Sequence, residues 1–195
     1  MDYHGAIDHI LKRLKVELTA DLSYHNLEHT LAVTRNCRKI AKAEGISEHD
    51  LKLLLTAAAY HDAGFLEAYA DNEPVGCRIA EEALARYNYQ PRDIERVKAL
   101  ILATRPSRRP ENELQEIICD ADLFYLGGDQ YYDIAESLHR ELRAQDHEIS
   151  DEEWLKMQID LLEKHRYYTS FARRTRDANK KKILKELCLK QQKGD

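Results

Sequence analysis

The sequence predicts an all-α protein built as one helical bundle, and three observations support that fold class. Apolar residues recur at intervals of three and four along most of the chain, which places them on one face of a helix. The 195 residues include only seven glycines and four prolines, too few for the many turns of a β-rich protein. No segment of convincing length alternates between apolar and polar residues, as a half-buried strand would.

The first three helices are predicted from apolar stripes and end signals. The first stripe spans residues 7–18, and the second, spanning residues 27–41, is closed by Gly45. Ser47 with Asp50 resembles a capping box, which opens a third helix that runs toward His61. The apolar positions of these stripes are Ile7, Ile10, Leu11, Leu14 and Leu18, then Leu27, Leu31, Thr34, Cys37, Ile40 and Ala41, then Leu51, Leu54, Leu55 and Ala58.

Prolines and glycines delimit the elements that follow. Residues 71–74 combine a polar cap with an early proline and start a fourth helix, and residues 91–93 start a fifth. Residues 105–110 hold two prolines and no apolar residue, which predicts a loop. A sixth helix resumes near Leu114 and is expected to end at the glycine pair of residues 127–128.

Three further helices complete the predicted fold. One covers about residues 131–145, one runs from the Ser150–Glu153 capping box to about His165, and a basic, polar helix forms the tail. No internal repeat, low-complexity stretch or linker is present. We therefore predict a single domain over residues 1–195, with a motif core at about 24–128 on which the helices of 129–195 pack.

Composition limits the functional classes. Hydrophobic residues make up 43% of the chain and charged residues 33%, which suits a soluble globular protein. No run approaches the roughly 18 apolar residues of a membrane span, and residues 1–5 lack the layout of a signal peptide, so we expect a cytoplasmic protein. The net charge of −5 argues against a general nucleic-acid binder, although the last thirty or so residues are basic.

The four cysteines are far apart and never form a Cys-x-x-Cys pair. Each lies in an apolar-periodic segment, where a free cysteine behaves as a small hydrophobe. The pattern argues against a disulfide framework and against a zinc ribbon. The positions are Cys37, Cys77, Cys119 and Cys188.

A histidine and an aspartate stand side by side where the third predicted helix ends. His61 and Asp62 follow the apolar run of residues 57–60, and Gly64 is expected to supply the end of the helix. Two ligating groups at the mouth of an apolar helix are costly to bury unless something compensates them, and a metal ion would.

Further nitrogen and oxygen donors lie at other predicted helix ends. His25 and His29 are spaced i and i+4 near the start of the second helix and are expected to share one face. Asp120 and Asp122 lie about sixty residues beyond the His-Asp doublet. Such donors suit divalent ions such as Mn, Fe or Mg.

This order of motifs resembles the HD-domain superfamily of metal-dependent phosphohydrolases. That family is marked by a His, a His-Asp doublet and a later Asp on a helical bundle. The opening Tyr24–His25–Asn26–x–x–His29 also resembles that of cyclic-nucleotide phosphodiesterases of the same superfamily. Residues 71–73 and 120–123 are similar to a group of bacterial predicted HD phosphohydrolases.

The resemblance implies a role for each matching residue. His29, His61, Asp62 and Asp122 would be the metal ligands; Asp120 competes for the last place, and the family's Ala-Asp-Leu pattern favours Asp122. His25 would be the general acid. One divalent ion is expected because residues 63–112 contain no histidine, and a second ion is left open.

The implied activity is hydrolysis of a phosphate ester by metal-activated water. The substrate would be a nucleotide or another small phosphorylated metabolite, as a monoester or a diester. Asn26 or Glu73 would orient a ligand or the attacking water. The alternative is a non-catalytic, metal-stabilised module that binds or senses a nucleotide, and a homo-oligomer is left open.

Two groups outside these motifs complete the prediction. If the loop of residues 105–110 folds over the site, Arg105, Arg108 and Arg109 would suit phosphate groups as planar donors. Trp154 and the pair Tyr167 and Tyr168 are interpreted as packing residues.

Overall fold

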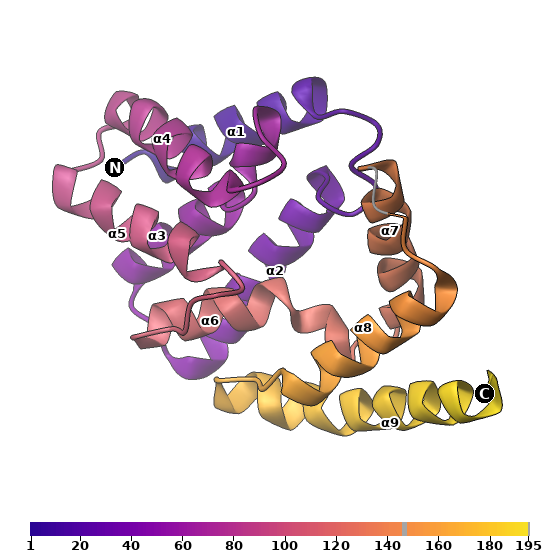
Figure 1. Ribbon diagram of the computed structural model, residues 1–195. Coiled ribbons are helices and arrows are strands. Elements are labelled where there is room, and N and C mark those ends of the chain that lie inside the picture. The colour runs from indigo at the N-terminus through magenta and orange to yellow at the C-terminus, as the bar shows by residue number, and fades with distance from the viewer. Residues whose placement is uncertain (146–147, 195) are drawn as a thin grey trace.

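The computed structural model describes residues 1–145 and 148–194 (Figure 1). Within these residues the chain folds into α-helices and short 3-10 helices and forms no strand. The predicted all-α fold class is therefore confirmed.

The helices follow one another with short connections. The α-helices are α1 (Tyr3–Glu17), α2 (Leu27–Glu44), α3 (Glu48–Tyr60), α4 (Asn72–Leu84), α5 (Pro91–Ala103), α6 (Glu113–Asp122), α7 (Tyr131–Ala144), α8 (Asp151–Lys164) and α9 (Ser170–Gly194). The 3-10 helices are η1 (Ala63–Leu66), η2 (Ala85–Tyr87) and η3 (Phe124–Gly127).

The predicted end signals act as expected at several helices. Gly45 ends α2 with a φ of 80°, in the left-handed region that glycine tolerates best. The Ser47 side chain accepts from the Asp50 backbone N–H at the start of α3. Ser150 and Glu153 form a complete capping box at the start of α8.

The predicted end of the sixth helix is wrong. The helix α6 ends at Asp122 and not at residues 127–128, and η3 follows. The Leu123 carbonyl accepts from the Leu126 N–H, three residues further on, which is the pattern of the tighter 3-10 turn. The same carbonyl also accepts from the Tyr167 hydroxyl. Gly127 serves packing instead, because an added Cβ would lie 2.4 Å from the Arg176 carbonyl oxygen of α9.

Two clusters of buried side chains hold the helices together. The larger cluster gathers residues of α1 to α6 around α3, in which residues 53–60 are all buried. The smaller cluster joins η3, α7, α8 and α9 through residues such as Leu126, Tyr131 and Leu187. The helices α8 and α9 lie together along one edge of the bundle, and α7 stands beside the start of α2 (Figure 1). In the described part of the chain, no helix combines the length and apolar character needed to cross a bilayer.

Candidate metal centre

The His61–Asp62 doublet lies where α3 gives way to η1. His61 caps α3 in helical geometry, and Asp62 precedes the 3-10 turn, so the change of helix type aims both side chains at one region. The prediction that Gly64 ends α3 is wrong. Gly64 lies inside η1, and its φ is not positive. Its role is close approach, because an added Cβ would lie 1.8 Å from the Asn72 carbonyl oxygen at the start of α4.

The first turn of α2 supplies His29. Asn26 is the N-cap of this helix: its Oδ1 accepts from the N–H groups of Glu28 and His29, and its Nδ2 donates to the Ser23 carbonyl. The Asn26 side chain thus contacts backbone groups and fixes the helical turn that carries His29. Its predicted role in orienting a ligand or the attacking water stays a prediction.

His25 is not a helical residue, which corrects its predicted placement one turn from His29. It precedes the N-cap, because Asn26 takes the extended conformation of a capping residue and α2 begins at Leu27. The rings of His25 and His29 nevertheless lie 6.0 Å apart, edge to face.

The last turn of α6 supplies Asp122. Two residues earlier, Asp120 is fully buried and turned away toward the start of α9, where it accepts from the N–H groups of Tyr168 and Thr169 and from the Thr169 hydroxyl. Of the two competing aspartates, the structure brings Asp122 to the histidines and uses Asp120 as an anchor.

The donor atoms of these segments converge. Nε2 of His29 lies 3.2 Å from Nε2 of His61, 3.3 Å from Oδ2 of Asp62 and 3.2 Å from Oδ1 of Asp122. Nε2 of His61 lies 3.1 Å from the same Asp62 oxygen and 3.7 Å from the Asp122 oxygen. Four side chains from three distant parts of the sequence thus meet in one small volume.

Charge balance within the cluster is shown by the pKa directions. Burial lowers the pKa of His29, but the carboxylates of Asp122 and Asp62 outweigh it and raise that pKa to about 8. The same carboxylates raise the pKa of His61 against its burial. Burial raises the pKa values of Asp62 and Asp122, and the histidines outweigh it and lower both. The carboxylates and imidazoles of the cluster therefore favour each other's charged forms.

The arrangement fits a divalent ion. Neighbouring ligands on an octahedral ion with bonds near 2.1 Å lie about 3 Å apart, close to the separations given above. Nδ1 of His61 faces the Ala58 carbonyl at 2.9 Å, which leaves Nε2 free to bind a metal. Oδ2 of Asp62 is buried without a hydrogen-bond partner in the described chain. An ion would bring positive charge to the two carboxylates and would pair that oxygen.

Sequence reasoning missed Glu141 of α7. Its buried carboxylate accepts from the backbone N–H groups of Tyr24 and His25 at 2.7 and 2.9 Å through Oε2. Its Oε1 pairs with Nδ1 of His25 and accepts from the Tyr69 hydroxyl at 3.2 Å. The signal available in the sequence was a glutamate on the apolar side of the predicted helix 131–145, which no nearby motif marked.

Besides Glu141, two aromatic residues contact the His25 ring. Phe65 of η1 stacks on it with ring centroids 4.3 Å apart, and Tyr69 lies edge to face with it. The Nδ1 of His25 is committed to Glu141, so Nε2 is the nitrogen left for exchange with a bound molecule.

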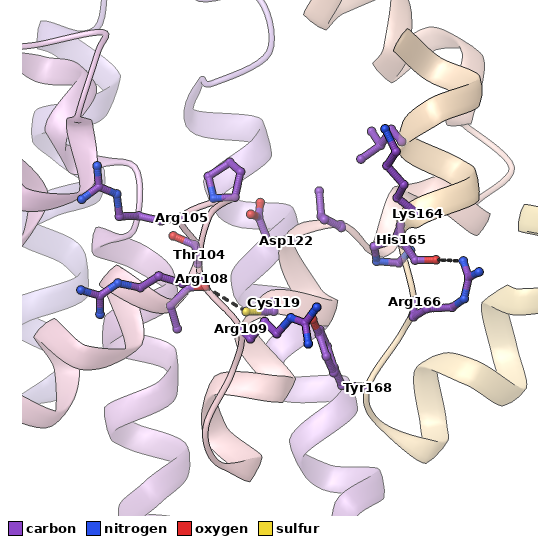
Figure 2. Close-up of a pocket in the computed structure, with 14 residues that line it drawn as sticks. Thr104, Arg105, Arg108, Arg109, Cys119, Asp122, Lys164, His165, Arg166 and Tyr168 are labelled. Atoms are coloured by element: carbon purple, nitrogen blue, oxygen red, sulfur yellow. Dashed lines mark hydrogen bonds between the residues drawn. The ribbon is translucent and has the colours of Figure 1, made fainter. Parts of the chain in front are cut away.

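The predicted arginines lie at the edge of a pocket of about 490 Å³ beside Asp122 (Figure 2). Arg105 is held away from the pocket by Asp71 and by Glu73, whose carboxylate lies 3.7 Å from its Nε. Arg108 also points away, whereas Arg109 extends toward Tyr168. Glu73 thus lies in the first turn of α4 as the partner of Arg105.

A second pocket, of about 410 Å³, reaches the same centre between α2 and α7. Both His29 and Asp122 line it, together with polar residues such as Asn36, Gln130 and Ser137. The centre is therefore open to small molecules from more than one side.

Comparison with known proteins identifies the family of this chain and structures with a similar fold. A family model described as HD domain matches residues 26–126, and the chain belongs to that family, whose members are generally hydrolases that bind divalent metals. The match includes His29, His61, Asp62 and Asp122, and it excludes both His25 and Glu141. No curated protein matches the chain.

Solved structures share the fold at low identity. The crystal structure of a predicted HD superfamily hydrolase from an uncultured Thermotogales bacterium is 22% identical, with a TM-score of 0.57 over 71% of this chain and 83% of that one. A protein of Lactobacillus plantarum is 19% identical, with a TM-score of 0.67 over the full length of both chains. YpgQ of Bacillus subtilis, in complex with ADP, is 18% identical, with a TM-score of 0.68 over 99% of this chain and 97% of that one.

Proposed function

We propose that this protein is a metal-dependent phosphohydrolase that cleaves a phosphate ester of a nucleotide or of a similar small metabolite. The observation that carries the proposal is the convergence of two imidazoles and two carboxylates beside an open pocket, with a further histidine close by. Such a donor set binds Mn, Mg or Fe, and we propose one ion per site.

His29, His61, Asp62 and Asp122 would hold the ion. When bound, it supplies Lewis acidity toward the phosphoryl group and makes water a stronger acid near neutral pH. Phe65 and Glu141 clamp the His25 ring on two sides, and Glu141 directs its Nε2 away from α7. Protonated there, His25 donates a proton to the leaving oxygen and so avoids the release of an alkoxide.

A nucleotide is the substrate class that the surroundings support best. The pocket beside Asp122 has the size of a small-molecule site, and Arg109, which extends toward Tyr168 at its edge, can pair with phosphate oxygens. The structurally similar YpgQ binds ADP, which supports the same class of ligand for this chain.

Phosphate release from a panel of monoesters, diesters and nucleotides tests the proposal. We expect release that requires added Mn or Mg and stops with a chelator. His25→Ala should lower the rate at least about a hundredfold, the usual contribution of a general acid, while metal content is unchanged.

Two outcomes would decide against an enzyme. Metal-loaded protein that releases no phosphate from any member of the panel would contradict the proposal. If that protein still binds ADP, and His25→Ala binds it equally well, the chain is instead a nucleotide-binding or sensing module.

A further inference from the structure

The pocket beside Asp122 is formed by two segments far apart in the sequence. One wall is the segment of residues 103–109, which leads from α5 toward α6, and the other is the end of α8 with the turn to α9 at residues 161–168 (Figure 2). The end of α6, with Cys119, Asp122 and Leu123, lies between them. The second wall lies outside the region that the HD family model matches.

The interior of this pocket is largely apolar. Leu161 and Tyr168 line it and are both 37% exposed, and they belong to the few large apolar side chains that the described chain leaves open to solvent. The Cys119 thiol donates to the Ala103 carbonyl, so it offers no free donor. Burial, with the charges of Lys180 and Arg166, lowers the pKa of His165 to about 4, which leaves an uncharged planar ring at neutral pH.

The apolar wall is held in a fixed relation to the metal centre. Asp120 accepts from the Tyr168 and Thr169 N–H groups at 2.9 and 2.7 Å, and it lies only two residues from Asp122 on α6. The backbone that carries the Tyr168 ring and the carboxylate of the centre therefore belong to one rigid unit.

The mouth of the pocket is cationic, and part of that charge is unpaired. Lys164 pairs with Asp160, Arg166 donates to backbone carbonyls, and Arg105 pairs with Asp71. Within the part of the chain that the structure describes, no hydrogen bond or ion pair engages the guanidinium groups of Arg108 and Arg109. Arg109 extends toward Tyr168 (Figure 2), and its charge opposes the burial that raises the Tyr168 pKa.

We propose that this pocket binds the planar organic group of the substrate, a nucleobase or an aryl ring, and that Leu161 and Tyr168 select for it. The proposal rests on the proposed function, because a phosphate joined to that ring would then face Asp122. A ring placed against Tyr168 gains stacking and apolar contact, and Arg109 adds attraction to the ring face or to a phosphate.

A matched pair of ligands tests this assignment. Adenosine 5′-monophosphate and ribose 5-phosphate carry the same ester on the same oxygen and differ by the base. We expect calorimetric titration of the metal-free protein, in which turnover is absent, to show at least about tenfold tighter binding of the nucleotide, the size of one stacking contact.

Substitutions then locate the ring. Tyr168→Ala and Leu161→Ala should each remove most of the preference and leave the affinity for ribose 5-phosphate unchanged. Tyr132→Ala and Leu189→Ala, which remove exposed apolar side chains of the same types elsewhere, should keep it. With metal added, the same two pocket variants should raise KM for the nucleotide and leave kcat nearly unchanged.

Three results would overturn the assignment: wild-type protein that binds the two ligands equally or binds neither, pocket variants that keep the preference, or pocket variants that weaken both ligands alike. The proposed function fails separately, when the metal-free protein prefers the nucleotide in these titrations but the metal-loaded protein releases no phosphate.

Discussion

Asp120 and Asp122 differ by two positions on one helix and yet have opposite environments. Asp122 meets His29 and His61, whereas three donors of the segment before α9 surround the fully buried Asp120. Burial raises the pKa of Asp120, and its hydrogen bonds act against that rise. The same residue type is therefore expected to serve binding at one position and stability at the other.

Substitution of each aspartate by asparagine separates these roles. Asp122→Asn should lose most of the bound metal, because a charged ligand is gone, while the fold is kept. Asp120→Asn should keep the metal but lower the free energy of unfolding by about 2 kcal/mol, since hydrogen bonds to a carboxylate weaken. Elemental analysis and denaturant titration of both variants measure the two effects, and equal metal loss in both would contradict the assignment.

Glu141 positions His25 without reaching the metal cluster in any contact described above. It holds the backbone of residues 24–25 and the Nδ1 of the ring at once, so it fixes both the place of the imidazole and its tautomer. A glutamine of the same shape keeps the acceptor oxygen but loses the charge that pairs with an imidazolium.

The effect of Glu141→Gln on kcat should therefore depend on whether the leaving group needs a proton. We expect a fall of at least about tenfold in kcat for an alkyl phosphate, whose leaving oxygen needs a proton, and little change for 4-nitrophenyl phosphate. Metal content should stay at the wild-type level. Tyr69→Phe, which removes only the neutral donor to the same carboxylate, is the matched control, and an equal loss on both substrates would indicate a merely structural role.

At the scale of the element, periodicity predicted helices well and their junctions less well. The stripes of α1 to α5 were readable because apolar positions recur at helical spacing, and the side chains of Asp2, Asn26 and Ser47 cap α1, α2 and α3. The placement of His25 on α2 and the end of α6 at residues 127–128 were wrong, because tertiary partners decide both. Those partners are Glu141 and Tyr167, which lie 116 and 44 residues away from the groups they contact.

His165, in the turn between α8 and α9, should make the free energy of unfolding depend on pH. The pKa of His165 is lowered to about 4 in the folded protein from an ordinary value of 6.5, so the unfolded chain binds the extra proton first. Its contribution is present above pH 6.5 and is lost as pH falls from 6.5 toward 4. After allowance for its partial exposure, we expect a loss of about 2 kcal/mol over that window.

His165→Phe removes the titrating group and keeps a planar ring. Denaturant titrations at pH 7 and pH 5 should show a smaller loss of stability in this variant than in the wild type. An identical pH dependence in both proteins would show that His165 contributes nothing to it.

At the scale of the whole molecule, the arrangement of helices could be predicted further than the site. The fold class follows from periodicity, and the order of the His, His-Asp and Asp motifs predicted which side chains meet. Glu141 could not be predicted, because a single glutamate on an amphipathic helix has no local signature. The apolar wall was missed because Tyr168 was interpreted as a packing residue, and its partial exposure depends on where α9 starts.

We propose that the chain unfolds as a single domain and that metal stabilises it. Both η3 and α9 contribute buried residues to each of the two clusters, so the clusters are joined through these elements. Calorimetry should show one transition, and Mn at about a hundred times its Kd should add about 2.7 kcal/mol. A chelator should reverse the shift, and Asp122→Asn should show none; two transitions would contradict the single domain.

The contacts of Glu141 also have a consequence for the order of folding. Its bonds to residues 24–25 close a loop of 116 or 117 residues, and over similar separations Ser23 contacts Ser137 of α7 and Asp21 contacts Gln145 directly after α7. Long loops are entropically costly to close, so these contacts are expected to form late, after α2, α3 and α6 have packed. Pulse-labelled hydrogen exchange during refolding should accordingly show early protection in α3 and delayed protection of the amides of Tyr24 and His25.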